Sequence, residues 1–424
     1  MNSKIKSVHA RQIVDCKCRP MVEVDVVTED GFLGRGCAPT GSSVGMFESC
    51  VLRDNDPAEY HGLSVHKAVD NVNTILAPAL IGKDVSHQEE LDQIMIDLDG
   101  TPEKKNLGGN AIYSTSIALF RAAAEASHQT LYEYIAGGNI QTVPVPSFNV
   151  INGGHYENLT QPFNEFIIMP YGASSIYESV EMGINTFQEL EKVLTKYLGH
   201  KPVVAPSYGY ASPSEDPEVN LNLMSEAIEN CGYTGKIGFA FDCASSEMYD
   251  RETNTYLLKG ERVSADVLID YVKGLTEKFN FVFIEDLLDE EDWESYPKAH
   301  KVITRTNLLG DDFIVTNLNR LKRAYDLDAL DGFILKPNQV GTITEALHTY
   351  EFAKAHQLIA TPSGRAGGVI GDVVMDLAVG LQVGFIKNGA PRSGERIDKL
   401  NFLMRACDLA PNCKLADITP LLKF

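Results

Sequence analysis

The first third of the chain alternates apolar and polar positions. Residues 21–28 read Met-Val-Glu-Val-Asp-Val-Val-Thr, a period of two that is typical of a strand with one buried face. A Glu-Asp-Gly turn separates this strand from a second short strand at 32–35, which predicts a β-hairpin. Apolar positions with helical spacing follow, and the expected helices span 65–76, 87–98 and 110–135. Strands followed by helices indicate an α+β domain, which we place at residues 1–139.

The remainder, residues 140–424, has continuous apolar runs in place of alternating ones. Such runs suit strands that are buried on both faces of a parallel sheet. Two of them come early, at 145–151 and 165–169, and strands then alternate with expected helices. A chain of 424 residues is too long for one ordinary core. The pattern therefore predicts an α/β barrel preceded by a smaller domain.

Five short apolar runs end in an ionisable residue. In chain order these residues are Asp242, Glu285, Asp311, Lys336 and Lys387. Glu285 and Asp311 are 26 positions apart, and Asp311 and Lys336 are 25 apart. Each interval is about the length of one strand and its return helix. In a barrel, such side chains gather at the mouth formed by the carboxyl ends of the strands. Three carboxylates there would repel one another without a cation between them, so the series predicts a metal-dependent enzyme.

The chemistry of the three acids also indicates which metal is bound. Hard carboxylate oxygens without His or Cys suit Mg²⁺, which keeps open positions for water and substrate oxygens. An alternative is that acids at strand ends cap neighbouring helices. One acid could serve that purpose, but three in register with two lysines favour the metal site.

Composition narrows the class of partner. The chain has 37 Lys and Arg against 58 Asp and Glu, a formal net charge of −21, which disfavours nucleic acids and anionic membranes as partners. The eight cysteines are scattered, which favours free thiols in a reducing compartment. We find neither a signal-peptide core nor an apolar run that approaches ~20 residues. We therefore expect a cytoplasmic protein that acts on a small anionic substrate.

With these motifs in view, the chain resembles enolase over essentially its whole length. The resemblance rests on ordered blocks, which include Ala10-Arg-Gln-Ile-Val-Asp15, Phe148-Asn-Val-Ile-Asn-Gly-Gly154, Phe241-Asp-Cys-Ala-Ser-Ser-Glu247, Ile284-Glu-Asp286, Leu335-Lys-Pro-Asn-Gln339 and Ile386-Lys-Asn-Gly-Ala-Pro391. It implies an enolase-type eight-stranded α/β barrel, residues 140–424, whose second strand runs opposite to the others. It also implies an N-terminal α+β capping domain, two Mg²⁺ ions per active site, and a homodimer or larger homo-oligomer.

The resemblance assigns metal ligands to this sequence. The family's metal-binding triad falls on Asp242, Glu285 and Asp311. Ser43, in the Gly-rich loop 41–45, matches the serine that ligates the second ion when that loop closes. Considered alone, this loop could equally be a simple turn.

The resemblance also assigns roles to basic residues. Lys336 matches the general base that removes the proton α to the substrate carboxylate, and Lys387 matches a lysine that pairs with that carboxylate. Lys336 can act as a base only if its pKa is lowered, which we expect Lys387 and nearby metal ions to do. Arg365 matches the arginine that binds the substrate phosphate, and Ser363 belongs to the same block.

The residues that would handle the leaving hydroxyl depart from the family pattern. The Gly-Asp-Glu-Gly-Gly-Phe loop, which carries the catalytic acid, reads Ala205-Pro-Ser-Tyr-Gly-Tyr210 and contains no carboxylate. The Ser-His-Ala-Gly loop reads His155-Tyr-Glu-Asn158, which aligns Tyr156 with the family histidine, or His155 after a one-residue shift. Glu165 is retained, but its neighbouring glutamine is Asn164.

The phosphate-binding block is changed as well. Ser-His-Arg-Ser-Gly reads Ser363-Gly-Arg-Ala-Gly367, so Gly364 replaces a histidine and Ala366 a serine. These small side chains are expected to leave room for a larger substituent near the phosphate. The residues assigned to proton abstraction are retained, whereas those assigned to the leaving hydroxyl and the phosphate are changed. This combination indicates a working enzyme with a changed substrate or a changed second half-reaction.

We therefore predict a Mg²⁺-dependent lyase that eliminates water from a 2-phosphoglycerate-like acid, specialised for a phosphonate analogue, like the enolase-like proteins that make carboxyphosphonoenolpyruvate. Glu165, Tyr208 or Tyr156 would protonate the departing hydroxyl, although either tyrosine could equally fill vacated space. The alternatives are ordinary 2-phosphoglycerate dehydration, enolisation that ends in epimerisation or transfer, and a non-catalytic binding protein.

Overall fold

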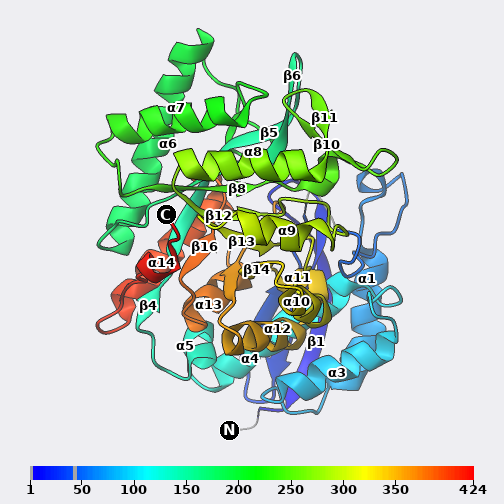
Figure 1. Cartoon of the computed structure of the whole chain (residues 1–424). Helices are drawn as coiled ribbons and strands as arrows, with labels where there is room; N and C mark the ends of the chain where they lie inside the picture. The colour runs from blue at the N-terminus through cyan, green and yellow to red at the C-terminus, as the bar shows by residue number, and fades with distance from the viewer. Residues whose placement is uncertain (1–2, 42–44) are drawn as a thin grey trace.

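The computed structural model describes residues 3–41 and 45–424 (Figure 1). Its first sheet is antiparallel and consists of β1 (Ile5–Val14), β2 (Pro20–Thr28) and β3 (Leu33–Cys37), in that order. The predicted hairpin is confirmed, because Val27 of β2 pairs with Leu33 of β3. Glycine is required at Gly34 and Gly36, where an added Cβ would lie 2.0 Å from a carbonyl oxygen of helix α4 (Gly109–Ala126). The helix therefore packs directly on the strand.

The helices of this first part match two of the three predicted spans, 65–76 and 87–98, and divide the third. They are η1 (Tyr60–Gly62), α1 (His66–Asn71), the π-helical turn η2 (Val72–Leu76), α2 (Ala77–Leu80), α3 (Gln88–Asp99), α4 (Gly109–Ala126) and α5 (Leu131–Ala136). The single helix expected over 110–135 is wrong. His128 has a positive φ of 56°, and Thr130 forms a complete capping box with Glu133. A left-handed residue followed by a new N-cap ends one helix and starts another.

The second part is a closed barrel. Its strands are β5 (Val145–Tyr156), β6 (Leu159–Met169), β8 (Gly238–Asp242), β12 (Phe281–Glu285), β13 (Asn307–Gly310), β14 (Gly332–Leu335), β15 (Ile359–Pro362) and β16 (Phe385–Lys387). Strand β6 is antiparallel to both β5 and β8, and the other pairings between neighbours are parallel. A parallel bridge between Ser363 and Lys387 joins β15 to β16 and closes the ring. The predicted enolase-type barrel with a reversed second strand is confirmed.

Helices surround the barrel (Figure 1). They are α6 (Ile176–Leu198), α7 (Pro217–Asn230), α8 (Ala265–Lys278), α9 (Ser295–Val302), α10 (Leu318–Asp326), α11 (Pro337–Val340), α12 (Ile343–Ala355), α13 (Val373–Gly380) and α14 (Gly394–Leu409). The minor elements are β4 (Thr142–Val143), β7 (Tyr210–Ala211), η3 (Ser245–Met248), β9 (Tyr249–Asp250), β10 (Thr255–Leu258), β11 (Glu261–Val263), β17 (Lys414–Leu415) and η4 (Thr419–Leu421).

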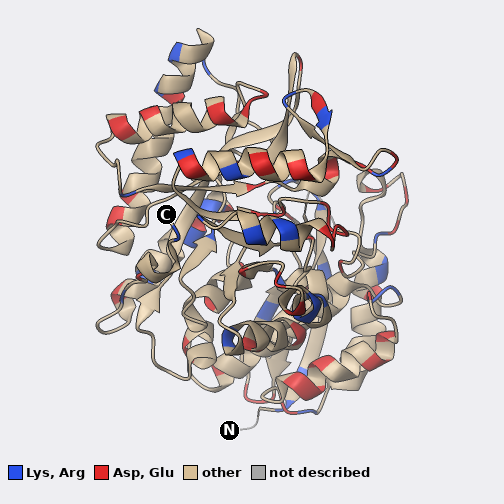
Figure 2. Cartoon of the chain, viewed as in Figure 1, with Lys and Arg blue, Asp and Glu red and all other residues tan. Residues whose placement is uncertain are grey.

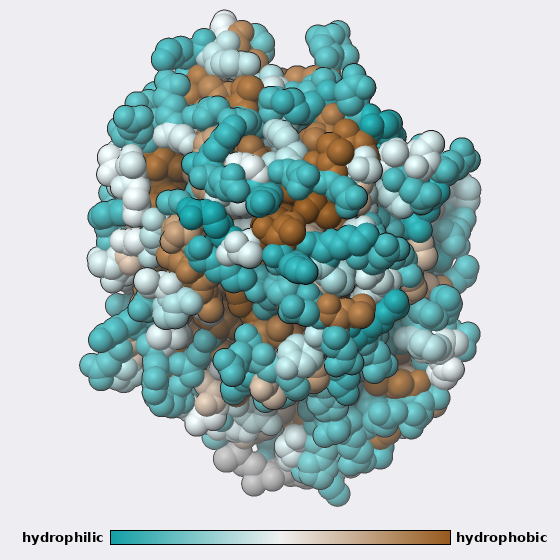
Figure 3. Space-filling model, viewed as in Figure 1, coloured by the Kyte–Doolittle hydropathy of each residue, from teal (hydrophilic) through white to brown (hydrophobic). Residues whose placement is uncertain are grey.

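Two apolar clusters account for the barrel. One, which contains no helix residue, takes a residue such as Ala240, Phe283, Leu309, Ile334 or Phe385 from successive strands and fills the barrel interior. The larger one packs the outer faces of the strands against the helices. Charged side chains of both signs are spread over the outer helices (Figure 2), and the visible face is mostly hydrophilic with separate apolar patches (Figure 3). None of the helices in the described residues has the length and apolar character needed to cross a membrane.

Candidate active site

Strand alternation places the five ionisable residues in the barrel mouth. Each follows, two positions later, a residue of the interior cluster, and successive side chains of a strand alternate between its faces. The five pairs are Ala240 and Asp242, Phe283 and Glu285, Leu309 and Asp311, Ile334 and Lys336, and Phe385 and Lys387. The same argument applies to Glu165, which lies two positions before interior Ile167 on the reversed strand β6.

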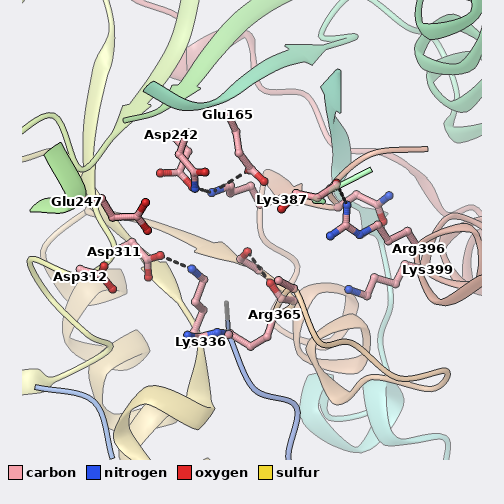
Figure 4. Close-up of a pocket in the computed structure, with 18 residues that line it drawn as sticks. Glu165, Asp242, Glu247, Asp311, Asp312, Lys336, Arg365, Lys387, Arg396 and Lys399 are labelled. Atoms are coloured by element: carbon pink, nitrogen blue, oxygen red, sulfur yellow. Dashed lines mark hydrogen bonds and ion pairs between the residues drawn. The ribbon is translucent and has the colours of Figure 1, made fainter. Parts of the chain in front are cut away.

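A cavity of about 330 Å³ opens at this mouth (Figure 4). Of the residues predicted from sequence, its lining includes Asn164, Glu165, Asp242, Asp311, Lys336, Ser363, Arg365 and Lys387. Glu285 does not line the cavity because it is fully buried beneath it. The structure thus brings together residues that are up to about 220 positions apart in the chain, as barrel closure requires.

Lys387 lies among three carboxylates. Its Nζ is 2.6 Å from Oε2 of Glu285, 2.7 Å from Oδ2 of Asp242 and 3.5 Å from Oε2 of Glu165. Burial lowers the pKa of Lys387, but the charges of Asp242 and Glu285 outweigh it and hold the pKa well above its ordinary value. Burial and the charge of Asp242 raise the pKa of Glu285 well above its ordinary value. Lys387 is therefore the cation that this acidic group surrounds.

Lys336 is paired with Asp311 on the neighbouring side of the cavity. Its Nζ donates to Oδ2 of Asp311, whose Oδ1 accepts a 2.8 Å hydrogen bond from Nε2 of Gln339. Burial lowers the pKa of Lys336, but the charge of Asp311 more than offsets this effect, so the pKa is raised. Lys387 alone does not lower this pKa, and the expected effect of nearby metal ions stays a prediction. Lys387 does oppose protonation of Lys336, but the adjacent carboxylate dominates.

The acidic group fits a hard divalent cation. The two carboxylate oxygens of Glu285 accept no well-formed hydrogen bond within the described residues. Asp286, Asp311 and Asp312 can also bring one oxygen each within 4.8 Å of one another. Both oxygens of Asp286, however, accept backbone N–H groups of residues 311 and 312, at 2.8 and 2.7 Å. Glu285 is therefore the carboxylate of this group whose oxygens remain most available to a cation, beside Asp242 and Asp311, which already contact Lys387 and Lys336.

Acid charge at the mouth exceeds what the lysines neutralise. Burial and the charge of Asp311 raise the pKa of Asp312 to about 9 and that of Asp286 to about 7. Burial and the charge of Asp242 also raise the pKa of Glu247, another residue of the lining. Protonation and cation binding are the two ways to relieve such repulsion. The Ser43 assignment lies outside the described residues, whereas Gly41 of the same loop lines the cavity.

Arg365 connects the barrel to the first part of the chain. Its Nη1 donates to Oε2 of Glu48 at 2.9 Å and its Nη2 to Oε1 at 3.0 Å, and both side chains are buried. Such a bidentate pair fixes the plane of the guanidinium. Ser363 also lines the cavity, with its Oγ 3.2 Å from the carbonyl oxygen of Gly364. The placement of Arg365 thus depends on a contact that spans 317 positions of sequence.

Three of the residues predicted to act near the departing hydroxyl do not line the cavity. His155 is exposed, with its Nδ1 3.0 Å from Oγ1 of Thr160, because β5 and β6 continue as a hairpin where the sequence indicated a loop. Tyr156 donates its hydroxyl to backbone carbonyls of the same strand, at 2.9 and 3.0 Å. Tyr208 has a φ of 71°, and Arg396 lies over its ring. Glu165 is the candidate acid that remains in the lining, and its Oε1 accepts from Nδ2 of Asn149 at 2.9 Å.

The structure adds cavity residues that the sequence did not reveal. Glu247 stands in a matching block and Asp312 directly follows a predicted ligand, so these two had a sequence signal. Arg396 and Lys399 had none, because they come from α14 and reach the cavity through helix packing. The room expected at Gly364 is not open, since an added Cβ there would lie 2.1 Å from Nζ of Lys399.

Comparisons with known proteins agree with this architecture. The family model described as the enolase N-terminal domain matches residues 5–135, and the model of the enolase C-terminal TIM barrel domain matches residues 140–417. An enolase of Methanococcus maripaludis is 42% identical over 402 residues, which cover 95% of this chain and 94% of the relative. An enolase of Methanococcus vannielii is 40% identical over the same lengths. The chain belongs to the enolase family.

Proposed function

We propose that this protein is a Mg²⁺-dependent hydro-lyase that removes the proton α to a carboxylate and eliminates water from an acid related to 2-phosphoglycerate. The observation that carries the proposal is the pair of buried lysines among strand-end carboxylates in one cavity. Membership of the enolase family supports the reaction class. The altered residues bear on which phosphorus group the substrate carries, a phosphate or a phosphonate.

Proton abstraction is assigned to Lys336. The reaction requires its neutral amine to accept the α proton at Nζ, while Asp311 engages the resulting ammonium as it does here. Lys387 would hold the substrate carboxylate, since its ammonium already lies between carboxylate groups of the site. Bound Mg²⁺, held by Asp242, Glu285 and Asp311, would supply positive charge that stabilises the growing negative charge on the substrate carboxylate.

The departing hydroxyl needs a proton, and we assign that proton to Glu165. It is the carboxyl group of the lining that faces Lys387 from the reversed strand β6, at 3.5 Å. Protonated Glu165 would deliver its proton to the leaving oxygen, so that water departs and the carbon–carbon double bond forms. Tyr156 and Tyr208 are less suited to this role because their hydroxyls hydrogen-bond to backbone carbonyls outside the lining.

The finer part of the proposal is a phosphonate substrate. Ala366 lines the cavity where the family block has a serine, and Ser207 lines it where the family loop has an acid. Ala366 removes a hydroxyl from the phosphorus-bearing end of the substrate, and Ser207 removes a carboxyl group from the part of the site that handles the leaving hydroxyl. A phosphonate, in which a methylene replaces the bridging ester oxygen, would make no demand on a hydrogen bond to that oxygen.

The test is proton NMR in D₂O with purified protein and Mg²⁺. 2-Phosphoglycerate and its phosphonate analogue are incubated separately, and loss of the α-proton signal and appearance of vinyl protons are followed together. Faster elimination of the phosphonate supports the whole proposal. Faster elimination of 2-phosphoglycerate overturns the phosphonate assignment and leaves the hydro-lyase. Exchange without elimination from either compound would indicate epimerisation or transfer, and would overturn the role of Glu165.

A further inference from the structure

Lys399 has a buried ammonium group with hydrogen-bonding capacity to spare. It is on α14, lines the cavity, and its side chain is only 4% exposed. Among the described residues its one ionic neighbour is Asp372, whose Oδ2 lies 3.7 Å away and accepts no hydrogen bond. An ammonium has three donors, and leaving them unused in a buried position is unfavourable. A group of this kind facing a cavity is suited to an anionic ligand.

Gly364 is what allows the ammonium into the cavity. A Cβ at that position would lie 2.1 Å from Nζ and 3.2 Å from Cε of Lys399, so no larger side chain fits without moving the lysine. The φ of Gly364 lies outside the left-handed region, so backbone conformation does not explain the glycine. The family block has histidine there. In this chain a lysine from a distant helix occupies the place that a side chain at 364 would take.

The charges of the cavity are divided between two sides (Figure 4). Asp242, Glu247 and Asp311 lie on one side, and Arg396 and Lys399 on the other. Arg396 is already engaged, because it donates to the carbonyl oxygen of residue 207 and lies 5.0 Å from the ring centroid of Tyr208. Lys399 therefore offers the less committed cation on the basic side.

We infer that Lys399 binds the phosphorus-bearing anion of the substrate and helps set its specificity, in place of a side chain at position 364. This inference rests on the proposed function, which puts the substrate carboxylate at Lys387 and the phosphorus group on the opposite, basic side. The chemistry recognised is a phosphoryl or phosphonyl dianion attached to a small carboxylic acid. Both have three terminal oxygens that can accept from an ammonium.

The experiment is isothermal titration calorimetry with Mg²⁺ present, using 2-phosphoglycerate and its phosphonate analogue as separate probes. Lys399→Met removes the charge, and Gly364→Ala keeps the charge but displaces the ammonium with a methyl group. Arg405→Met is the control, because Arg405 is on the same helix with a side chain 60% exposed. We expect each of the first two variants to weaken binding about 10- to 100-fold, and the control to have no effect.

The outcomes separate this inference from the proposed function. α-Proton exchange by the unmodified protein tests the reaction, whereas the calorimetry tests Lys399 without turnover when every protein compared also carries Lys336→Met, which removes the assigned base. Equal binding with and without Lys399→Met overturns the inference, as does failure of the protein with Lys336→Met alone to bind either probe. Should Lys399→Met fail to fold, as judged by thermal unfolding, Gly364→Ala decides alone. The probe that loses more affinity identifies whether phosphate or phosphonate is the better ligand.

Discussion

The two ends of the barrel both collect charged residues, but their charges are balanced differently. At the amino end, Asp331 precedes β14, accepts a 2.9 Å hydrogen bond from the backbone of residue 308, and pairs with His300 and Lys423. At the carboxyl end, the oxygens of Glu285 accept no well-formed hydrogen bond within the described residues, and Lys387 is shared among three acids. The amino end is satisfied by its own groups, whereas the carboxyl end has acid charge in excess.

This difference shows how to distinguish structural charge from functional charge in one fold. A carboxylate such as Asp331, with two cationic partners and a backbone donor, needs no ligand to be stable. A buried carboxylate such as Glu285 requires a proton or a cation, and burial raises its pKa accordingly. Barrels of this kind use the carboxyl end for chemistry and the amino end for stability. Substitutions at the two ends should therefore separate activity from stability.

The largest effect is expected for Lys336→Met. Removing the assigned base should slow α-proton exchange by about 10⁴-fold, measured by proton NMR in D₂O. The matched change at the amino end, Lys423→Met, removes an ion pair with Asp331 and should leave exchange within about twofold of the unmodified protein. Equal loss in both variants would mean that the two ends do not differ in function.

A smaller and more selective effect is expected for Glu165→Gln. The amide keeps the size of the side chain and can still contact Asn149, but it cannot give a proton to the leaving hydroxyl. Elimination should fall on the order of 10²- to 10³-fold, while α-proton exchange persists. Both rates come from one NMR time course. Unchanged elimination would remove Glu165 from the role of acid.

Mg²⁺ should stabilise the folded protein through the carboxyl end only. A ligand at 100 times its dissociation constant adds about 2.7 kcal/mol to the free energy of unfolding. The midpoint of thermal unfolding should therefore be higher with Mg²⁺ than with a chelator, both in the unmodified protein and in Asp331→Asn. The difference should largely disappear in Asp311→Asn, and the chelator should stop exchange. A full Mg²⁺ response in Asp311→Asn would place the ion elsewhere.

The barrel and its strand-end residues could be predicted because both follow from short-range pattern. Continuous apolar runs indicate buried parallel strands. Because side chains alternate along a strand, Asp242 and Lys336 point into the mouth of the barrel. The reversed second strand came from the resemblance to enolase, since no local pattern encodes strand direction. The break near His128 was missed because helical spacing continues across it, although the capping box Thr130–Glu133 was readable.

The rest of the site depends on tertiary contacts. The pairing of Glu48 with Arg365 joins segments 317 positions apart, and the entry of Lys399 depends on how α14 packs beside Gly364. The pKa of Lys336 was expected to be lowered by Lys387 and nearby metal ions, but the contact with Asp311 raises it. Sequence blocks identify which residues are present, whereas the balance of charge between neighbouring side chains depends on the fold.

The smallest predicted effect concerns the amino end and pH. A hydrogen bond with Asp331 raises the pKa of His300, although burial opposes it. Burial raises the pKa of Asp331, but hydrogen bonds from His300 and Lys423 outweigh this effect and lower it. The contribution of His300 to stability is full below its unfolded pKa of about 6.5 and is lost as pH rises through its raised folded pKa. That of Asp331 is lost only as pH falls below about 3.9.

Both groups are therefore charged and paired at pH 5.5, and His300 loses its contribution towards pH 8. Urea unfolding of the unmodified protein and of His300→Gln should give a larger stability difference at pH 5.5 than at pH 8. The change in that difference should be up to about 1 kcal/mol, since one pKa unit corresponds to about 1.4 kcal/mol. α-Proton exchange should be the same in both proteins, because no residue of this cluster lines the cavity. A difference independent of pH would mean that His300 acts through packing, and a loss of exchange would mean that the two ends of the barrel are coupled.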